Sequence, residues 1–280
     1  MADISVMTPG EGFNTLLRAR HGTFLYNRND TYVGRSLQLY GEYCESESRI
    51  FTQLCQPNDS VVEIGANIGA HTVPMAKAVG VGGMVYAFEP QRVVFQTLCA
   101  NAALNSLTNV ECHWAAVGRE SGEVLIPDIN YDKSSNFGGV AVDGFSEGRK
   151  VPLVALDSHL DLPHLRLLKI DVEGMEAQVL EGAKETIATH RPYIYLENDR
   201  VEKSEALIRQ VMGMEYRLYW HLPTLFSPDN FFGSEDNVFE NIIAVNMFCI
   251  PSELSPELEG FHEVSDPSEH PMRRSLEETT

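Results

Sequence analysis

The chain has 280 residues, which suits one α/β domain with extensions better than two small domains. Its hydrophobic fraction is 43%, and no apolar run reaches the roughly 18 residues of a membrane span. A net charge of −19 argues against nucleic-acid binding, which needs a basic surface. Five scattered cysteines without a CxxC pair predict free thiols. Because the N-terminus lacks the basic and apolar regions of a signal peptide, the protein is predicted to be cytoplasmic.

Residues 1–56 precede the first predicted strand and are expected to form a helical extension, or lid, beside the main domain. A helix is predicted over 46–54, where Ile50, Phe51 and Leu54 share one face. Three tyrosines before it either cover a cavity or pack in the interior, and both interpretations stay open. These tyrosines are Tyr32, Tyr40 and Tyr43.

The most informative stretch is VVEIGANIG at 61–69, in which an apolar run opens into a loop with glycines at both ends. The run predicts a buried strand, and helical spacing follows the loop as far as Gly80. In an open parallel sheet such a loop lies at the carboxyl edge of the strands, where small molecules bind. Gly65 lets a ligand approach the backbone, and Gly69 permits tight packing of helix on strand.

The other side chains of the loop indicate which ligand binds. A dinucleotide-binding loop would have glycines where Asn67 and Ala70 stand. Glu63, at the strand end, would repel a pyrophosphate but attract the amino group of an amino acid. The second predicted strand, 84–88, ends at Glu89, where an acid can hold ribose hydroxyls. Adenosine joined to an amino-acid ammonium is S-adenosyl-L-methionine.

The rest of the chain continues the alternation of strands and helices. Further strands are predicted at 110–117, 165–170, 193–196, 216–221 and 241–246, the last two as an antiparallel pair. Helices are predicted after the second and fourth strands and over 201–214. The looser segment 118–150 is expected to form a partly structured hairpin beside the pocket. Residues 251–280 hold eight acids, two arginines and four prolines, which predicts a disordered acidic tail.

Three segments of the chain resemble successive signatures of the FkbM-type S-adenosylmethionine-dependent methyltransferases. They are EIGANIG at 63–69, AFEP at 87–90 and LKIDVEGME at 168–176. The resemblance implies a class I methyltransferase domain over 57–250, with a Rossmann-like, doubly wound, seven-stranded α/β sheet that ends in an antiparallel hairpin. It also implies S-adenosyl-L-methionine as methyl donor, and usually methylation of a hydroxyl on a sugar, polyketide or related small molecule.

The residues and the resemblance together predict the cofactor contacts. They are Glu63, Gly65, Ala66, Asn67, Gly69, His71, Glu89, Pro90, Ala116 and Asp171. His71 is expected to be a neutral hydrogen-bonding residue. Many class I methyltransferases bind the adenine amino group through an acid after the third strand. Because Trp114, Ala115 and Ala116 stand in that region here, backbone groups are expected to contact adenine.

Methyl transfer from a sulfonium to a hydroxyl needs a base or a metal, because a neutral hydroxyl is a poor nucleophile. Asp171, at the carboxyl end of the fourth strand, is the first candidate for the base, and His221 and His71 are weaker ones. Alternatively, Asp171, Glu197 and Asn198 bind Mg²⁺ through oxygen ligands. This set is similar to the acid, acid and asparagine of catechol-type methyltransferases.

Two other functions are alternative interpretations of the sequence. A NAD-dependent oxidoreductase or epimerase is disfavoured by Asn67 and Ala70 and by the absence of a Tyr-x-x-x-Lys pair. A catalytically degenerate cofactor-binding protein that serves as an interaction partner is disfavoured by the intact Glu63, Glu89 and Asp171. The acceptor, the choice between oxygen and nitrogen and the assembly state stay open, a homo-oligomer included.

Overall fold

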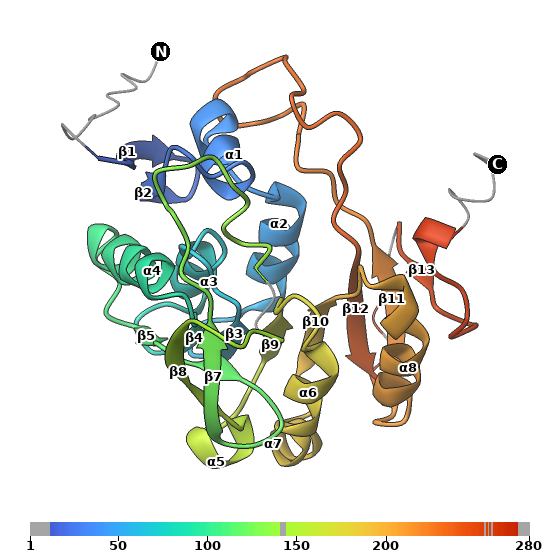
Figure 1. Cartoon of the computed structure of the whole chain (residues 1–280). Coiled ribbons are helices and arrows are strands. Elements are labelled where there is room, and N and C mark those ends of the chain that lie inside the picture. Colours follow the sequence, from blue (N-terminus) through green and yellow to red (C-terminus); the bar gives the residue numbers. More distant parts are fainter. Residues whose placement is uncertain (1–11, 141–143, 255, 257, 259, 274–280) are drawn as a thin grey trace.

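The computed structural model describes residues 12–140, 144–254, 256, 258 and 260–273 (Figure 1). Within these ranges no helix is both long and apolar enough to cross a bilayer. The described residues form one large mixed sheet with helices on both faces, a small three-stranded sheet, and a hairpin near the N-terminus.

Among the described residues, the main sheet has eight strands in the order β13-β11-β12-β10-β9-β3-β4-β5. Strand β12 runs antiparallel to both of its neighbours, whereas the pairings from β10 to β5 are parallel. Seven of these strands form the predicted doubly wound sheet, and the two-residue β13 extends its edge. The bounds are β3 Ser60–Ile64, β4 Met84–Phe88, β5 Val110–His113, β9 Leu167–Ile170, β10 Tyr193–Glu197, β11 Tyr216–His221, β12 Asn246–Pro251 and β13 His262–Glu263.

Alternate residues of the strands pack against helices on opposite faces of the sheet, because successive side chains of a strand point to opposite sides. Val61 packs with Phe51 of α2 and Met75 of α3, whereas Val62 packs with Val179 of α6 and Ile208 of α8. The bounds are α2 Glu45–Leu54, α3 Thr72–Val79, α4 Arg92–Leu104, α5 Leu156–His159, α6 Glu176–Glu181, α7 Lys184–His190 and α8 Val201–Met212.

The segment before the first central strand is not wholly helical, which corrects the predicted helical extension. It begins with a hairpin of β1 Asn14–Ala19 and β2 Gly22–Asn27, followed by α1 Val33–Tyr40 and then α2. Asn101 of α4 holds this hairpin in place, because its amide group donates to Leu25 O (3.0 Å) and accepts from Leu25 N (2.6 Å). Residues 1–11 lie outside the described residues.

Three other predictions are corrected in detail. The last long strand is not 241–246 but β12, because the more apolar residues that follow fill the space between β10 and β11. The third strand ends at His113, and β6 Ala116–Val117 joins β7 Gly122–Ile126 and β8 Arg149–Val154 in the small sheet. This sheet contains the predicted hairpin, as the antiparallel pair β7 and β8.

The predicted disordered tail is ordered in part. His262 and Glu263 pair with β11, and His270 is buried, where it contacts Asn198 O at 2.8 Å. Residues 255, 257, 259 and 274–280 of this tail lie outside the described residues.

Candidate active site

The loop after β3 adopts the conformation for which its glycines are needed. Gly65 and Gly69 have φ angles of 81° and 85°, in the left-handed region that favours glycine. A Cβ atom on Gly65 would lie 1.8 Å from the Asp171 carbonyl oxygen, and one on Gly69 would lie 2.8 Å from Leu98 Cδ1. The first glycine therefore permits close approach of β3 and β9, and the second permits close packing on α4.

Glu89 fastens this loop to the end of β4. It is 4% exposed, and its two carboxyl oxygens accept the backbone N–H groups of Asn67 (3.0 Å) and Gln91 (2.8 Å). Burial raises the pKa of Glu89 to about 7, although both backbone hydrogen bonds act in the opposite direction. The carboxyl group thus lies in the wall of the cleft beside the backbone of the glycine loop.

Glu63 is almost completely buried, and its carboxyl group already has partners within the protein. It is 1% exposed, its Oε2 atom accepts a hydrogen bond from Thr72 Oγ1 (2.5 Å), and Lys169 Nζ lies 3.6 Å from its Oε1 atom. Burial raises its pKa. An ammonium group of the protein itself therefore lies beside Glu63, where the sequence predicted the ammonium of a ligand.

The ammonium group of Lys169 lies close to three acids near the glycine loop. Its Nζ donates to Asp171 Oδ2 at 3.1 Å, and its side chain is 3% exposed. Burial by itself lowers the pKa of Lys169, but the carboxylates of Asp171, Glu63 and Glu47 raise it above its ordinary value. Lys169 therefore stays protonated in the interior. A charged residue inside the otherwise apolar strand β9 was the sequence signal for this role.

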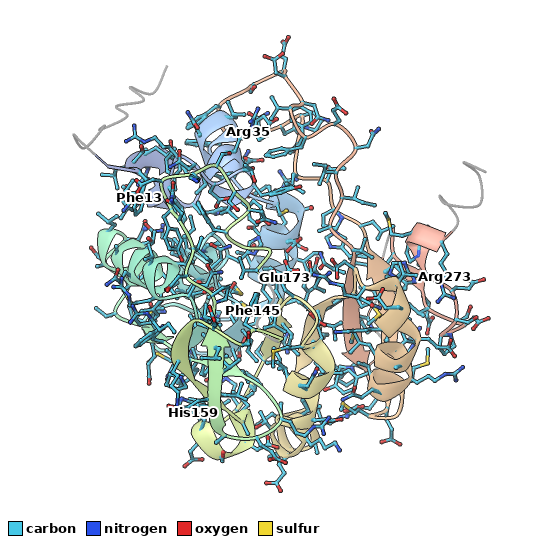
Figure 2. All side chains as sticks on the ribbon, viewed as in Figure 1. Phe13, Arg35, Phe145, His159, Glu173 and Arg273 are labelled. Carbon is cyan, nitrogen blue, oxygen red and sulfur yellow. The ribbon has the colours of Figure 1, made fainter. Side chains whose placement is uncertain are left out.

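A cavity of about 440 Å³ opens at the carboxyl ends of β3, β4, β9 and β10. The glycine loop forms one wall, and the N-terminal segment faces it with Tyr32, Tyr43 and Glu47. Both tyrosines thus line the cavity, whereas Tyr40 is fully buried and packs against Phe226 and Phe239. Glu173 also lines the cavity, and Figure 2 labels it near the middle of the view.

Most of the predicted site residues meet at this cavity. Those that line it are Glu63, Gly65, Ala66, Asn67, His71, Glu89, Pro90, Asp171 and Glu197. Gly69 instead packs behind the loop, against Leu98. Ala116 lies in the wall of a small apolar recess next to the cavity, shared with Gly65, Pro90 and Val172.

The position of His221 contradicts its predicted catalytic role. Its Nδ1 atom lies 2.6 Å from the Tyr195 hydroxyl, and its ring contacts Phe261. Burial lowers its pKa to about 4. His221 is not among the residues that line the cavity, because β11 is separated from β10 by the intervening strand β12.

The predicted magnesium ligands are not brought together. Asn198 is buried on the other side of the chain from Glu197, where its Nδ2 atom contacts Ser204 Oγ (3.0 Å) and Met247 Sδ (3.3 Å). These contacts hold the Asn198 amide group on the α8 side of the sheet, whereas Glu197 lines the cavity. Another acidic group forms instead, in which Glu173, Glu197 and Asp199 each place one oxygen within 4.8 Å of the others.

This acidic group already has a cation beside it. Arg200 contacts Glu173 Oε2 at 2.7 Å and Asp199 Oδ1 at 3.3 Å. Burial, with the nearby Asp171, raises the pKa of Glu173 to about 7, and burial raises the pKa of Glu197 well above its ordinary value. The carboxyl groups of this acidic group therefore carry less negative charge in total than three fully ionised acids would.

Glu47 is a second cavity residue, after Lys169, whose role the sequence did not predict. It is 5% exposed, its Oε1 atom accepts a hydrogen bond from Asn246 Nδ2 (3.1 Å), and its Oε2 atom lies 3.9 Å from His71 Nε2. Glu47, Phe51 and Leu54 occur at helical spacing on one face of α2. An acid within that apolar face was the available signal.

A doubly wound sheet with a glycine loop after its first central strand and an acid after the next defines the class I methyltransferase fold. The family model of the methyltransferase FkbM domain matches residues 63–219, more than half of the chain. The protein therefore belongs to the FkbM methyltransferase family.

The chain is similar to several other proteins at low sequence identity. Methyltransferase 1 of Beauveria bassiana (strain ARSEF 2860) is 29% identical over 178 residues, which are 54% of this chain and 70% of the relative. The solved FkbM methyltransferase of Methylobacillus flagellatus KT is 17% identical with a TM-score of 0.46, and the match covers 72% of this chain but only 50% of that one. A solved S-adenosylmethionine-dependent O-methyltransferase of Thermotoga maritima is 13% identical with a TM-score of 0.48, over 89% of this chain and 80% of that one.

Proposed function

We propose that this FkbM-family methyltransferase transfers the methyl group of S-adenosyl-L-methionine to a hydroxyl group of a small molecule such as a sugar or a polyketide. The observation that carries the proposal is the Glu89 carboxyl group, which is tied to the Asn67 backbone across the glycine loop. A buried acid at this position can accept hydrogen bonds from the two ribose hydroxyls of the donor. The cavity volume of about 440 Å³ is in the range of small-molecule sites.

S-adenosyl-L-methionine would then lie along the glycine loop in a defined orientation. Its ribose would contact Glu89, and its adenine would enter the apolar recess between Pro90 and Val172, beside Ala116. Its amino-acid end would extend toward His71 and Asp171, which also line the cavity. The acceptor would enter beside Tyr32, Leu225 and Ile243, which give that part of the wall an apolar character. Positioning of the two reactants supplies much of the rate of such a displacement.

Replacing Glu89 with glutamine tests the proposal through donor binding. We expect S-adenosylhomocysteine to bind the variant at least about tenfold more weakly, because hydrogen bonds to a charged group contribute about 1.5–3 kcal/mol each. The measurement is isothermal titration calorimetry, with thermal unfolding to confirm that the variant is folded.

Glu111→Gln is the control, because Glu111 is an exposed acid on β5. Its affinity for S-adenosylhomocysteine should equal that of the wild type. If NAD binds more tightly than S-adenosylhomocysteine, the oxidoreductase interpretation replaces this one. If neither binds, the protein is a degenerate member of the fold. The predicted cytoplasmic location stays a prediction.

Magnesium is not part of this proposal, because the residues present do not fit the predicted set. Asn198 faces away from the cavity, and Arg200 already pairs with two carboxylates of the alternative group. We therefore expect millimolar Mg²⁺ or excess EDTA to leave both the thermal midpoint and the affinity for S-adenosylhomocysteine unchanged. A rise in the midpoint that saturates with Mg²⁺ and disappears in Glu197→Gln would contradict this expectation.

A further inference from the structure

The helix α2, which lies outside the part of the chain that matches the family, places one acid inside the cavity. Glu47 is almost wholly buried, yet it lines the cavity opposite the glycine loop. Asn246 of β12 fixes one of its carboxyl oxygens, and the other oxygen is directed toward His71 at the start of α3. A buried acid needs partners to offset its loss of hydration. The Cys44 thiol also hydrogen-bonds the Glu47 carboxyl group, and the Oε2 atom of Glu47 lies 3.9 Å from His71 Nε2.

His71 is unsatisfied at the same point. Its Nε2 atom is buried and has no hydrogen-bond partner among the described residues. Backbone groups of Cys44 and Tyr43 hydrogen-bond the ring and raise its pKa. Because Nε2 has no partner in the described part of the chain, we assign these bonds, and with them the ring proton, to Nδ1. Burial nevertheless lowers the pKa of His71 well below its ordinary value. The ring is therefore neutral, and a free lone pair on Nε2 faces Glu47.

We propose that Glu47 is the catalytic base of methyl transfer, and that His71 is the positioning residue that holds Glu47 after it has received the proton. This inference rests on the proposed function and adds the group that activates the acceptor. As the acceptor oxygen attacks the methyl carbon, its O–H proton passes to the Glu47 carboxylate. The new O–C bond forms, the C–S bond breaks, and its electron pair stays on sulfur, which leaves S-adenosylhomocysteine.

The lone pair of His71 gives the protonated carboxyl group a partner. A shift of about 1 Å would bring Glu47 Oε2 within hydrogen-bond distance of His71 Nε2. Asp171, the base expected from the sequence, is less suited to this step, because Lys169 already shares its carboxylate at 3.1 Å. Among the described residues, Glu47 has no ion pair with a lysine or an arginine.

The charge of Glu47 should be visible in donor binding, because S-adenosylmethionine carries a sulfonium charge that S-adenosylhomocysteine lacks. A carboxylate near the reacting centre attracts the sulfonium but not the neutral sulfur. Burial raises the pKa of Glu47 to about 8, so the group gains its charge as the pH rises toward and past that value. The preference for S-adenosylmethionine over S-adenosylhomocysteine should therefore grow with pH. Several ionisable or polar groups face Glu47. They are Lys169 of β9 and Asp171 just after it, His71 just before α3, Tyr195 of β10, Asn246 of β12, and Tyr43 and Cys44 before α2.

The experiment compares the affinities of both ligands by calorimetry from pH 6 to pH 9 in the wild type, Glu47→Gln and Glu45→Gln. Glu45 is the matched control, because it is a buried acid of the same helix that binds His21 and does not line the cavity. We expect the preference to rise about fivefold or more with pH in the wild type and in Glu45→Gln, and to be weak and independent of pH in Glu47→Gln.

Each other outcome overturns the proposal in its own way. Equal weakening of both ligands in Glu47→Gln would make Glu47 an anchor for the amino-acid end of the donor. A pH-dependent preference that survives in Glu47→Gln would assign the effect to another acid. A wild type whose preference does not change with pH would exclude a titrating carboxylate at the reacting centre, even if Glu47→Gln did not fold. If the wild type bound neither ligand, the proposed function would fail first.

Discussion

Replacing Lys169 with methionine is expected to lower the free energy of unfolding by about 3–5 kcal/mol, the usual cost of removing one partner from a buried ion pair. Methionine preserves the length and apolar stem of the side chain, so the loss would come from the charge. Glu63 and Asp171 lie 3.6 Å and 3.1 Å from the ammonium group and would keep their negative charges without a counter-ion. The measurement is urea unfolding near pH 7.

The pH gives this prediction a second test. Burial raises the pKa of Glu63 and of Glu47, so lowering the pH protonates these two acids and the loss of stability should shrink toward pH 5. Lys150→Met is the control, since Lys150 and its partner Glu123 are both exposed, and surface pairs of this kind contribute little to stability. An unfolding midpoint of Lys169→Met that matches the wild type near pH 7 would show that the acids are neutral without Lys169.

Gly65→Ala is expected to lower the free energy of unfolding by about 3 kcal/mol and to weaken the binding of S-adenosylhomocysteine strongly. Two effects combine: a positive φ angle disfavours alanine, and the added methyl group would meet the Asp171 carbonyl oxygen. That oxygen belongs to the backbone, so no rotation of a side chain can relieve the contact. The ends of β3 and β9 would have to separate, which would widen the loop where the donor is proposed to bind.

Gly144→Ala separates the two effects. Gly144 has nearly the same φ angle, 85°, but among the described residues no atom beyond its chain neighbours lies within 4 Å of an added Cβ. Alanine at position 144 should lower the free energy of unfolding only through the strain of a positive φ angle, by about 1 kcal/mol. Equal losses at both positions, measured by urea unfolding, would mean that the close approach of β3 and β9 is not a constraint.

Hydrophobic patterns in the sequence predicted most of the strands and helices, because each pattern is complete within one short segment. The strand over 84–88 and the strand over 216–221 have the predicted bounds, since apolar runs between turns are recognisable without any partner. The strand predicted at 241–246 was wrong, because two adjacent stretches can both form strands. The pairing of Met247 with Leu196 and Trp220 selects the second stretch. The β1–β2 hairpin was missed for a similar reason, since it is held in place by Asn101 on a distant helix.

The sequence by itself determined the glycine loop, the acids that follow the strands and, through them, the family and the class of cofactor. These residues are close together in the chain or occur at fixed positions relative to strand ends, so spacing alone relates them. The tertiary structure decided which acids face one another. It turned Asn198 away from Glu197, left His221 outside the cavity and brought Glu47 to His71 and Lys169. Those contacts depend on how α2 packs on the sheet, and no local pattern encodes that packing.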